Sequence, residues 1–272
     1  MVEENIKIGF IGVGKMGGII VRSVVDNLMP AQQIWITDLD QELVRHLSDE
    51  TGVNIASSID KLIPKIDVIV CAVPPVAIPY ILPKVASVLT SPQLIISIAA
   101  GVTTESLESY FDTLPPIVRV MPNIAASVQA AISVLTPGTE VEDSHLTITK
   151  EIFDTCGTTL VMDERHLNAV TAVSGSGPAY VALFVEALAD AGVNVGLSRQ
   201  DAQILATHTV LGAAKMLAET EEHPATLKNR VTTPGGTTAA GLHELEKGGI
   251  RSTLAEAIIA ATVRAEQLGT TK

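Results

Sequence analysis

The chain has 272 residues, of which 47% are hydrophobic and 18% charged, and its formal net charge is −12 at pH 7. This length and composition allow one large domain or two ordinary ones with a sizeable core, and they exclude a disordered chain. Because nucleic acids and anionic membranes bind clustered Lys and Arg, the acidic balance predicts neither as a partner.

Cysteine and histidine usage gives no sign of a metal or disulfide framework. The two cysteines, Cys71 and Cys156, lie in no CxxC pair, and the six histidines are scattered, so we expect no disulfide and no metal site. The first residues show no basic leader before an apolar run, which predicts no signal peptide and a cytoplasmic location. The longest uncharged stretch, 68–83, holds four prolines, which argues against a membrane-spanning helix there.

Short apolar runs alternate with helical patterns through residue 162. A helix is predicted from the glycine turn at 12–17 to residue 28, and another at 41–50, which Asp40 is able to cap. Strand–helix alternation of this kind predicts a mostly parallel sheet with helices on both faces, an α/β fold. Strands are expected at 6–11, 34–37, 67–72 and 94–98, with weaker ones at 118–121, 131–135 and 158–161.

The pattern becomes all-helical after residue 162, with helices expected at 179–191, 199–220 and 254–268. We therefore predict two domains, a sheet domain at 1–162 and a helical domain at 163–272. The helices carry apolar residues on more than one face. So small a domain cannot cover that much apolar surface alone, which predicts a partner subunit.

The hexapeptide Gly12-Val13-Gly14-Lys15-Met16-Gly17 fits the G-x-G-x-x-G pattern between a predicted strand and a predicted helix. The first glycine permits a tight turn, the second lets backbone approach a pyrophosphate, and the third allows close helix–strand packing. The free N–H groups at the helix start would face the phosphates. A plain glycine turn is the alternative, but the context predicts a dinucleotide site.

Asp38 ends the second predicted strand, 21 residues after Gly17. This is the place of the acidic residue that hydrogen-bonds the adenosine ribose, and a carboxylate there favours NADH over NADPH. The alternative is that Asp38 or Asp40 only caps the next helix.

Two segments of the second half are unusual for simple helix starts. The first, 174–180, reads SGSGPAY, and its small residues would let a backbone or a flat ligand come close, although an ordinary loop is the alternative. The second, 231–239, reads VTTPGGTTA, with two glycines and four threonines before a helix. Converging N–H groups at such a turn can bind a carboxylate, and threonine hydroxyls can reach a neighbouring polar atom.

Four segments resemble the pyrroline-5-carboxylate reductase family: LKNRVTTPGGTTAAGLHELE (227–246), AVSGSGPAYVALFVEALADAGV (172–193), IAAGVT (98–103) and RVMPN (119–123). The resemblance runs in register from residue 6 to residue 268, and the glycine loop occupies the family's place. It implies a Rossmann domain, a helical dimerisation domain whose helices interleave between subunits, and homodimers that assemble further, often into decamers. It also implies NADPH or NADH as cofactor and a small-molecule cyclic imine as substrate.

The resemblance also implies roles for residues of this chain. Thr238 would face the ring nitrogen as the catalytic group. The other substrate-binding residues would be Ser176, Thr233, Gly235, Gly236 and Thr237. Besides the glycine loop and Asp38, the cofactor-binding residues would be Ala72, Val73, Pro75, Ala99, Ala100, Met121 and Asn123. One departure is Pro74, where family members usually have a lysine, so a cation near the cofactor is missing.

The expected site lacks the proton donor that carbonyl reduction needs. Two-domain β-hydroxyacid dehydrogenases resemble this layout but carry a lysine where this chain has Val181. A cyclic imine is basic enough to be protonated in water and accepts hydride directly, so orientation in a dry pocket suffices. The sequence therefore favours imine reduction. The alternatives are a β-hydroxyacid dehydrogenase and a non-catalytic NAD-binding regulator.

Overall fold

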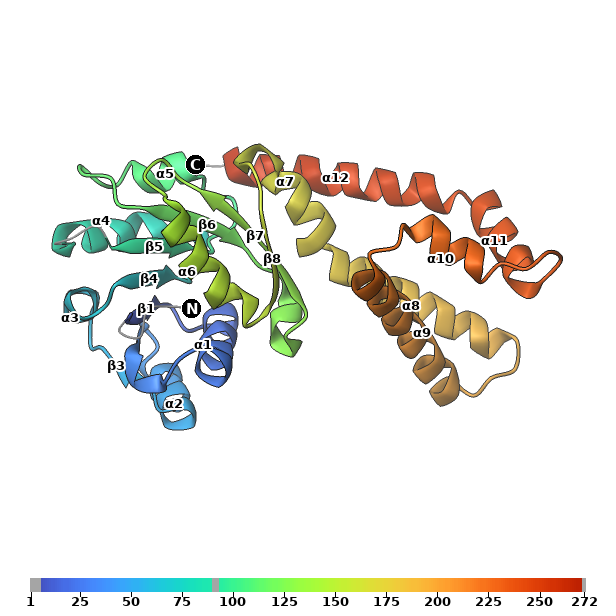
Figure 1. The fold of residues 1–272 in the computed structure, drawn as a ribbon, viewed down its shortest axis with the longest axis horizontal. Coiled ribbons are helices and arrows are strands. Elements are labelled where there is room, and N and C mark those ends of the chain that lie inside the picture. The colour runs from blue at the N-terminus through green and yellow to red at the C-terminus, as the bar shows by residue number, and fades with distance from the viewer. Residues whose placement is uncertain (1–5, 90–92, 271–272) are drawn as a thin grey trace. The chain divides into compact units, whose positions relative to one another are not determined.

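The computed structural model describes residues 6–89 and 93–270 (Figure 1). The prediction that no leader peptide is present was drawn from residues 1–5 and lies outside this range. The chain forms two compact units. The first runs to Gly175 and includes the chain again from Ala261, and the second is Ser176–Ala260.

The first unit is built on one eight-stranded sheet with the order β3-β2-β1-β4-β5-β6-β7-β8. Neighbouring strands of the described chain run parallel except for the β6–β7 pair, so the predicted mostly parallel sheet is confirmed. The strands are Ile8–Ile11 (β1), Ile34–Thr37 (β2), Asn54–Ile55 (β3), Val68–Cys71 (β4), Leu94–Ser97 (β5), Ile117–Met121 (β6), Ala131–Pro137 (β7) and Gly157–Val161 (β8).

Helices cover both faces of this sheet, as the strand–helix alternation predicts. One face carries α1 (Lys15–Asn27), α2 (Gln41–Thr51) and α6 (Asp143–Asp154). The other carries α3 (Ile59–Leu62), α4 (Ile78–Val88) and α5 (Thr104–Glu108).

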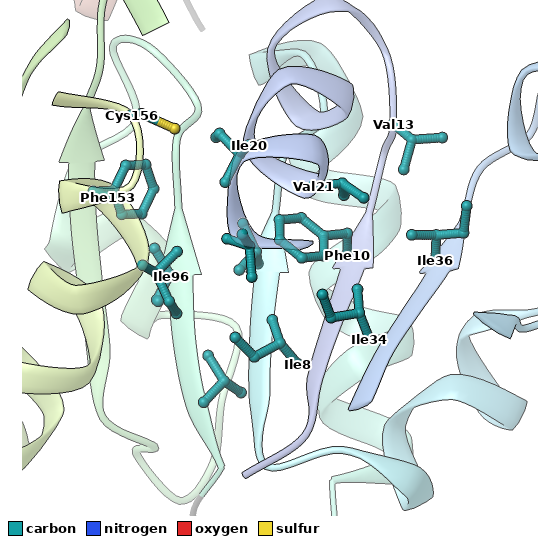
Figure 2. Packing of buried hydrophobic residues seen from close by; sticks show 14 of the residues in the cluster. Ile8, Phe10, Val13, Ile20, Val21, Ile34, Ile36, Ile96, Phe153 and Cys156 are labelled. Carbon is teal, nitrogen blue, oxygen red and sulfur yellow. The ribbon is translucent and has the colours of Figure 1, made fainter. Parts of the chain in front are cut away.

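Each strand sends alternate side chains into the two cores, because successive residues of a strand point to opposite faces. In β1, Ile8 and Phe10 join the core under α1, whereas Ile11 joins the core under α4. Figure 2 shows Phe10 of β1 next to Val21 of α1, with Ile36 of the adjacent strand β2 in the same cluster. Burial on both faces explains why these strands appear in the sequence as continuous apolar runs.

The segment after β8 packs on the sheet before the chain enters the second unit. Leu167 and Val170 of α7 (Leu167–Val170) are buried against Val134 of β7. A wider, π-type turn, Thr171–Gly175, follows. These contacts place residues 163–175 with the sheet. The predicted boundary after residue 162 marks the change of composition and stays a prediction.

The second unit is helical, as predicted. Its elements are α8 (Gly177–Asn194), α9 (Arg199–Thr220), α10 (Pro224–Arg230), α11 (Thr237–Lys247) and the first part of α12 (Ile250–Thr270). The α8–α9 contact buries Ala189, Ala202 and Ala206, and Val185 and Val193 pack against them. Large apolar side chains of these helices remain exposed, among them Val181, Leu183, Phe184, Leu188, Ile204, Leu205, Leu211, Leu254 and Ile259.

One helical stretch of the described chain, Glu164–Asn194, is long and apolar enough to cross a membrane by length and composition. That measure alone is weak evidence, and an apolar helix surface is equally what a subunit interface requires. The prediction that the protein has no membrane partner stays a prediction.

Candidate active site

The glycine loop turns the chain from β1 into α1 between the ends of two other strands. The Gly12 N–H donates to the carbonyl oxygen of Thr37, at the end of β2, over 2.9 Å. A Cβ on Gly12, whose φ is +92°, would lie 2.7 Å from the carbonyl oxygen of Ala72, just after β4. A Cβ on Gly17 would collide with the carbonyl oxygen of Gly12. The first and third glycines are therefore required by close approach of backbone.

The second glycine faces open space. A Cβ on Gly14 would meet no atom within 4 Å, and no side chain caps the start of α1. Lys15, the first residue of α1, is exposed, whereas Val13 is buried and Met16 packs on the core. The open start of α1 presents unpaired N–H groups and a positive dipole end, which is the arrangement that binds phosphate.

Asp38 and Asp40, which follow β2, have different hydrogen-bond partners. Asp40 caps α2, because its Oδ1 accepts hydrogen bonds from the backbone N–H groups of Glu42 and Leu43, each over 3.1 Å. Asp38 turns to the glycine loop: its Oδ2 accepts from the Val13 N–H over 2.7 Å, and its Oδ1 accepts from the Asp40 N–H over 3.1 Å. The helix cap is thus Asp40, and the Asp38 carboxylate is held against the loop.

The remaining predicted cofactor residues follow the next strands of the sheet. Ala72, Val73 and Pro75 come after β4, Ala99 and Ala100 after β5, and Met121 and Asn123 at and after the end of β6. The Ile98 N–H donates to the carbonyl oxygen of Cys71 over 3.1 Å, which keeps the segments after β4 and β5 adjacent. Since β1, β2, β4, β5 and β6 run parallel, their carboxyl ends bring these residues to the edge that holds the glycine loop.

Asn123 links the turn after β6 to the π-type turn that leads into α8. Its Nδ2 donates to the carbonyl oxygen of Ser174 over 3.1 Å. Its Oδ1 is buried and has no hydrogen-bond partner within the described part of the chain. A buried acceptor without a partner is costly, so a ligand that donates to it would remove the cost.

A partly buried ion pair that the sequence analysis did not identify holds two of these segments in place. Arg119 of β6, almost fully buried, donates to Glu164 Oε1 over 2.8 Å. The Thr104 N–H donates to the same oxygen over 2.8 Å, and its hydroxyl donates to Oε2 over 2.6 Å. Burial alone would raise the pKa of Glu164, but the hydrogen bonds from Thr104 and Arg119 outweigh it and lower the pKa below its ordinary value. Glu164 thereby joins the segment after β5 to β6.

Cys71 ends β4 within this region but offers no reactive thiol. Burial raises its pKa to about 12, so it stays protonated at neutral pH. Both cysteines are free and buried.

The predicted substrate residues belong to the second unit, whereas the predicted cofactor residues belong to the first. Thr233–Gly236 form a tight turn in which the Gly236 N–H donates to the carbonyl oxygen of Thr233 over 3.0 Å. Gly235 has a φ of +70°, which favours glycine. Helix α11 then begins at Thr237, and no side chain caps it. Thr238 is half-buried in its first turn, and Thr237 is exposed.

Ser176 occupies the corresponding position before α8. It is half-buried, and it makes no side-chain cap to the helix. The second unit therefore has two uncapped helix N-termini with a hydroxyl residue beside each.

A glycine loop at the carboxyl edge of a mostly parallel sheet, joined to a helical unit, defines a dinucleotide-binding protein of the Rossmann type. Two family models match: residues 164–268 match pyrroline-5-carboxylate reductase dimerisation, and residues 7–101 match NADP oxidoreductase, coenzyme F420-dependent. The chain is 39% identical to pyrroline-5-carboxylate reductase of Methanosarcina acetivorans, covering 98% of this chain and 99% of that protein. It belongs to the pyrroline-5-carboxylate reductase family.

Solved structures of the family have the same fold. The pyrroline-5-carboxylate reductase of Coxiella burnetii aligns with a TM-score of 0.95 at 33% identity, covering 98% of this chain and 100% of the other. That of Plasmodium falciparum, solved with NADP bound, aligns with a TM-score of 0.84 at 33% identity, covering 98% and 99%. The expected fold and family are thus confirmed.

Proposed function

We propose that the protein reduces the C=N bond of Δ1-pyrroline-5-carboxylate to give L-proline, with hydride from NADH or NADPH, as the last step of proline biosynthesis. Family membership over nearly the whole chain supports this reaction. The observation that carries it is the uncapped, threonine-flanked start of α11, which suits a small ring bearing a carboxylate.

The cofactor would occupy the carboxyl edge of the sheet. The open Gly14 and the uncapped start of α1 fit a pyrophosphate, with Val13, Lys15 and Met16 completing the loop. The partnerless Oδ1 of Asn123 fits a carboxamide N–H of the nicotinamide. When bound, the cofactor supplies the hydride. The other residues proposed to touch it are Ala72, Val73, Pro75, Ala99, Ala100 and Met121.

The substrate carboxylate would bind the turn before α11. Around Gly235, Gly236 and Thr237, the Gly236 N–H donates to Thr233 within the turn, whereas the N–H groups at the start of α11 have no helical partners, and the helix dipole adds positive potential there. The Thr238 hydroxyl would hold the ring nitrogen, and Thr233 and Ser176 would contact the substrate. Hydride transfer then requires that a sheet unit and such a turn, from one chain or from two, meet around the substrate.

Imine reduction suits a turn that carries no basic side chain. Residues 231–239 contain no Lys or His. A protonated cyclic imine already holds the proton that an alkoxide would need, so the protein has to orient it and exclude water. A carbonyl substrate would need a proton donor that this segment lacks.

We also propose that the protein acts in the cytoplasm as a homodimer and that these dimers assemble further into a decamer. The dimerisation family match supports self-association. The exposed apolar side chains of α8, α9 and α12 support a partner for these helices.

The test is nucleotide oxidation with pyrroline-5-carboxylate, followed by absorbance, with proline measured as the product. We expect saturable turnover and one proline formed for each nucleotide oxidised. Oxidation of a β-hydroxy acid in its place would support the dehydrogenase alternative. Nucleotide binding without turnover would support the regulator.

A further inference from the structure

We propose that Asp38 makes the protein select NADH over NADPH. This inference rests on the proposed function only in that the first unit holds a nicotinamide dinucleotide, and it concerns the adenosine end, away from the imine chemistry.

The Asp38 carboxylate is held ready to accept hydrogen bonds from a ribose. Its two oxygens accept from the Val13 and Asp40 N–H groups over 2.7 and 3.1 Å, which fixes the plane of the carboxylate at the end of β2. Each carboxylate oxygen has a further lone pair, so a fixed carboxylate can accept from both hydroxyls of an unmodified ribose. A 2′-phosphate removes one donor and brings negative charge to the same place.

Two segments next to Asp38 hold no cation that would offset this repulsion, and Arg45, the first cation beyond the first of them, is exposed. From Asp38 to Val44 the chain has three acidic residues, at 38, 40 and 42, and no Lys or Arg. From Ala72 to Pro83, on the other side of the loop, it has no basic residue either, with Pro74 exposed just after β4.

The two basic residues of α1 do not favour the phosphorylated nucleotide. Arg22 is paired with Glu50 over 2.7 Å, and that carboxylate raises the pKa of Arg22. Lys15 stands at the uncapped start of α1, where the pyrophosphate common to both nucleotides would lie. Its charge therefore strengthens the binding of both nucleotides and selects neither.

The experiment measures dissociation constants of NAD⁺ and NADP⁺ by titration calorimetry with the full chain, and the ratio of kcat/KM for NADH and NADPH. We expect the unaltered protein to favour the non-phosphorylated nucleotide by at least about tenfold, about 1.4 kcal/mol. Asp38→Ser should tighten NADP⁺ and weaken NAD⁺, moving the ratio by about tenfold or more. The matched control is Asp49→Asn, which removes the same charge from an exposed position near the other end of α2 and should leave the ratio unchanged.

If Asp38→Ser changes the affinities for the two nucleotides in opposite directions, Asp38 selects between them and does not only support the glycine loop. Equal weakening of both by Asp38→Ser would overturn the proposal, because Asp38 would then only hold Val13. If the unaltered protein binds NADP⁺ as tightly as NAD⁺ or more tightly, the proposal is overturned without any variant. The proposal can therefore be tested even if Asp38→Ser fails to fold. An equal shift with Asp49→Asn would overturn it in favour of a general field effect. Selective NAD⁺ binding without imine reduction would support it and contradict the proposed function alone.

Discussion

Thr238 brings a hydroxyl into the first turn of α11, whose uncapped N–H groups would bind the substrate carboxylate in the proposed function. Thr238→Ala removes that hydroxyl and leaves the N–H groups in place. We expect kcat/KM for pyrroline-5-carboxylate to fall by about 10- to 100-fold, about 1.4–2.7 kcal/mol, as for the loss of one oriented hydrogen bond to a charged group. Steady-state kinetics with each nucleotide at saturation measures this.

The neighbouring Thr237 provides the control for that measurement. Its side chain is exposed, and its proposed contribution is its N–H, so Thr237→Ala should cost less than Thr238→Ala. Cofactor affinity should stay constant in both variants. Unchanged kinetics for Thr238→Ala would mean that the turn is only structural, and lost nucleotide binding would contradict the division of roles between the turn and the glycine loop.

Glu164 is a positioning residue, and its replacement should destabilise the folded protein. Glu164→Gln leaves the buried Arg119 guanidinium without its anion. We expect the free energy of unfolding to fall by about 2–3 kcal/mol, less than for a fully enclosed pair because Glu164 is partly exposed. Urea denaturation of both proteins at neutral pH measures the difference.

The same pair predicts a pH dependence of definite sign. Because the folded state lowers the pKa of Glu164, its contribution to stability is complete above the ordinary value of 4.5 and is lost as the pH falls through the lowered folded-state pKa. The stability gap between the unaltered protein and Glu164→Gln should therefore be constant near neutral pH and shrink in acid. A gap that widened below pH 4.5 would contradict this assignment.

At this scale the sequence predicted residues whose signal is local. The glycine loop could be found because its three glycines stand at fixed spacing after an apolar run, and Asp38 because it ends the next strand. The pair of Arg119 and Glu164 could not, since its partners are 45 residues apart and meet only when the sheet is built. Nor could the pattern decide between Asp38 and Asp40 as the helix cap, because both precede α2 closely.

The strand–loop–helix element of β1 and α1 makes its own prediction. Gly14→Ala adds a methyl group where no atom lies within 4 Å, so folding should be unaffected, while the methyl would occupy the place proposed for the pyrophosphate. We expect the melting temperature to stay the same and the affinity for both nucleotides to fall by at least about tenfold, about 1.4 kcal/mol. Thermal unfolding and calorimetric titration together measure the two effects.

Gly17→Ala is the matched comparison within the same element. Its Cβ would collide with the carbonyl oxygen of Gly12, so the loop or the helix must shift. This variant should lose stability as well as affinity, by about 1–3 kcal/mol for overpacking. If Gly14→Ala were the less stable of the two, the loop would not have the open face described above.

Some elements are easier to predict from the sequence than others. The doubly buried strands were predictable because they are continuous apolar runs. Helix α4 was not, because Pro79 and Pro83 interrupt its pattern, although the first lies in its first turn, where a proline costs no hydrogen bond. Helix α6 was not predictable either, because it mixes β-branched Thr and Ile with polar residues. Strand β3 is too short to show a pattern and forms through its pairing with β2.

For the whole molecule, the sequence predicted the change from a sheet to helices, since composition changes there. It placed the boundary at residue 162, whereas contacts group the chain with the sheet as far as Gly175. That difference has a physical source: Leu167 and Val170 belong to helical sequence but are buried against β7. Packing against a surface formed by distant strands leaves no mark in local composition.

The exposed apolar surface of the helical unit predicts how the whole molecule behaves in solution. Leu183 of α8 is 64% exposed in the single chain, so replacing it should cost little if the chain acts alone. If α8 lies in an interface, Leu183→Glu places a charge in a dry contact. We then expect the unaltered protein to be a dimer or larger by light scattering at micromolar concentration, and the variant to dissociate and lose activity.

Leu114→Glu, in the sheet unit, is the control, because it changes a partly exposed leucine outside the helices and should leave the assembly intact. The melting temperature of the unaltered protein should also rise with protein concentration, since association stabilises only the folded chain. An active monomer with a concentration-independent melting temperature would contradict the proposed homodimer. It would also leave the exposed apolar side chains of α8, α9 and α12 without an explanation, because a soluble monomer rarely exposes so many.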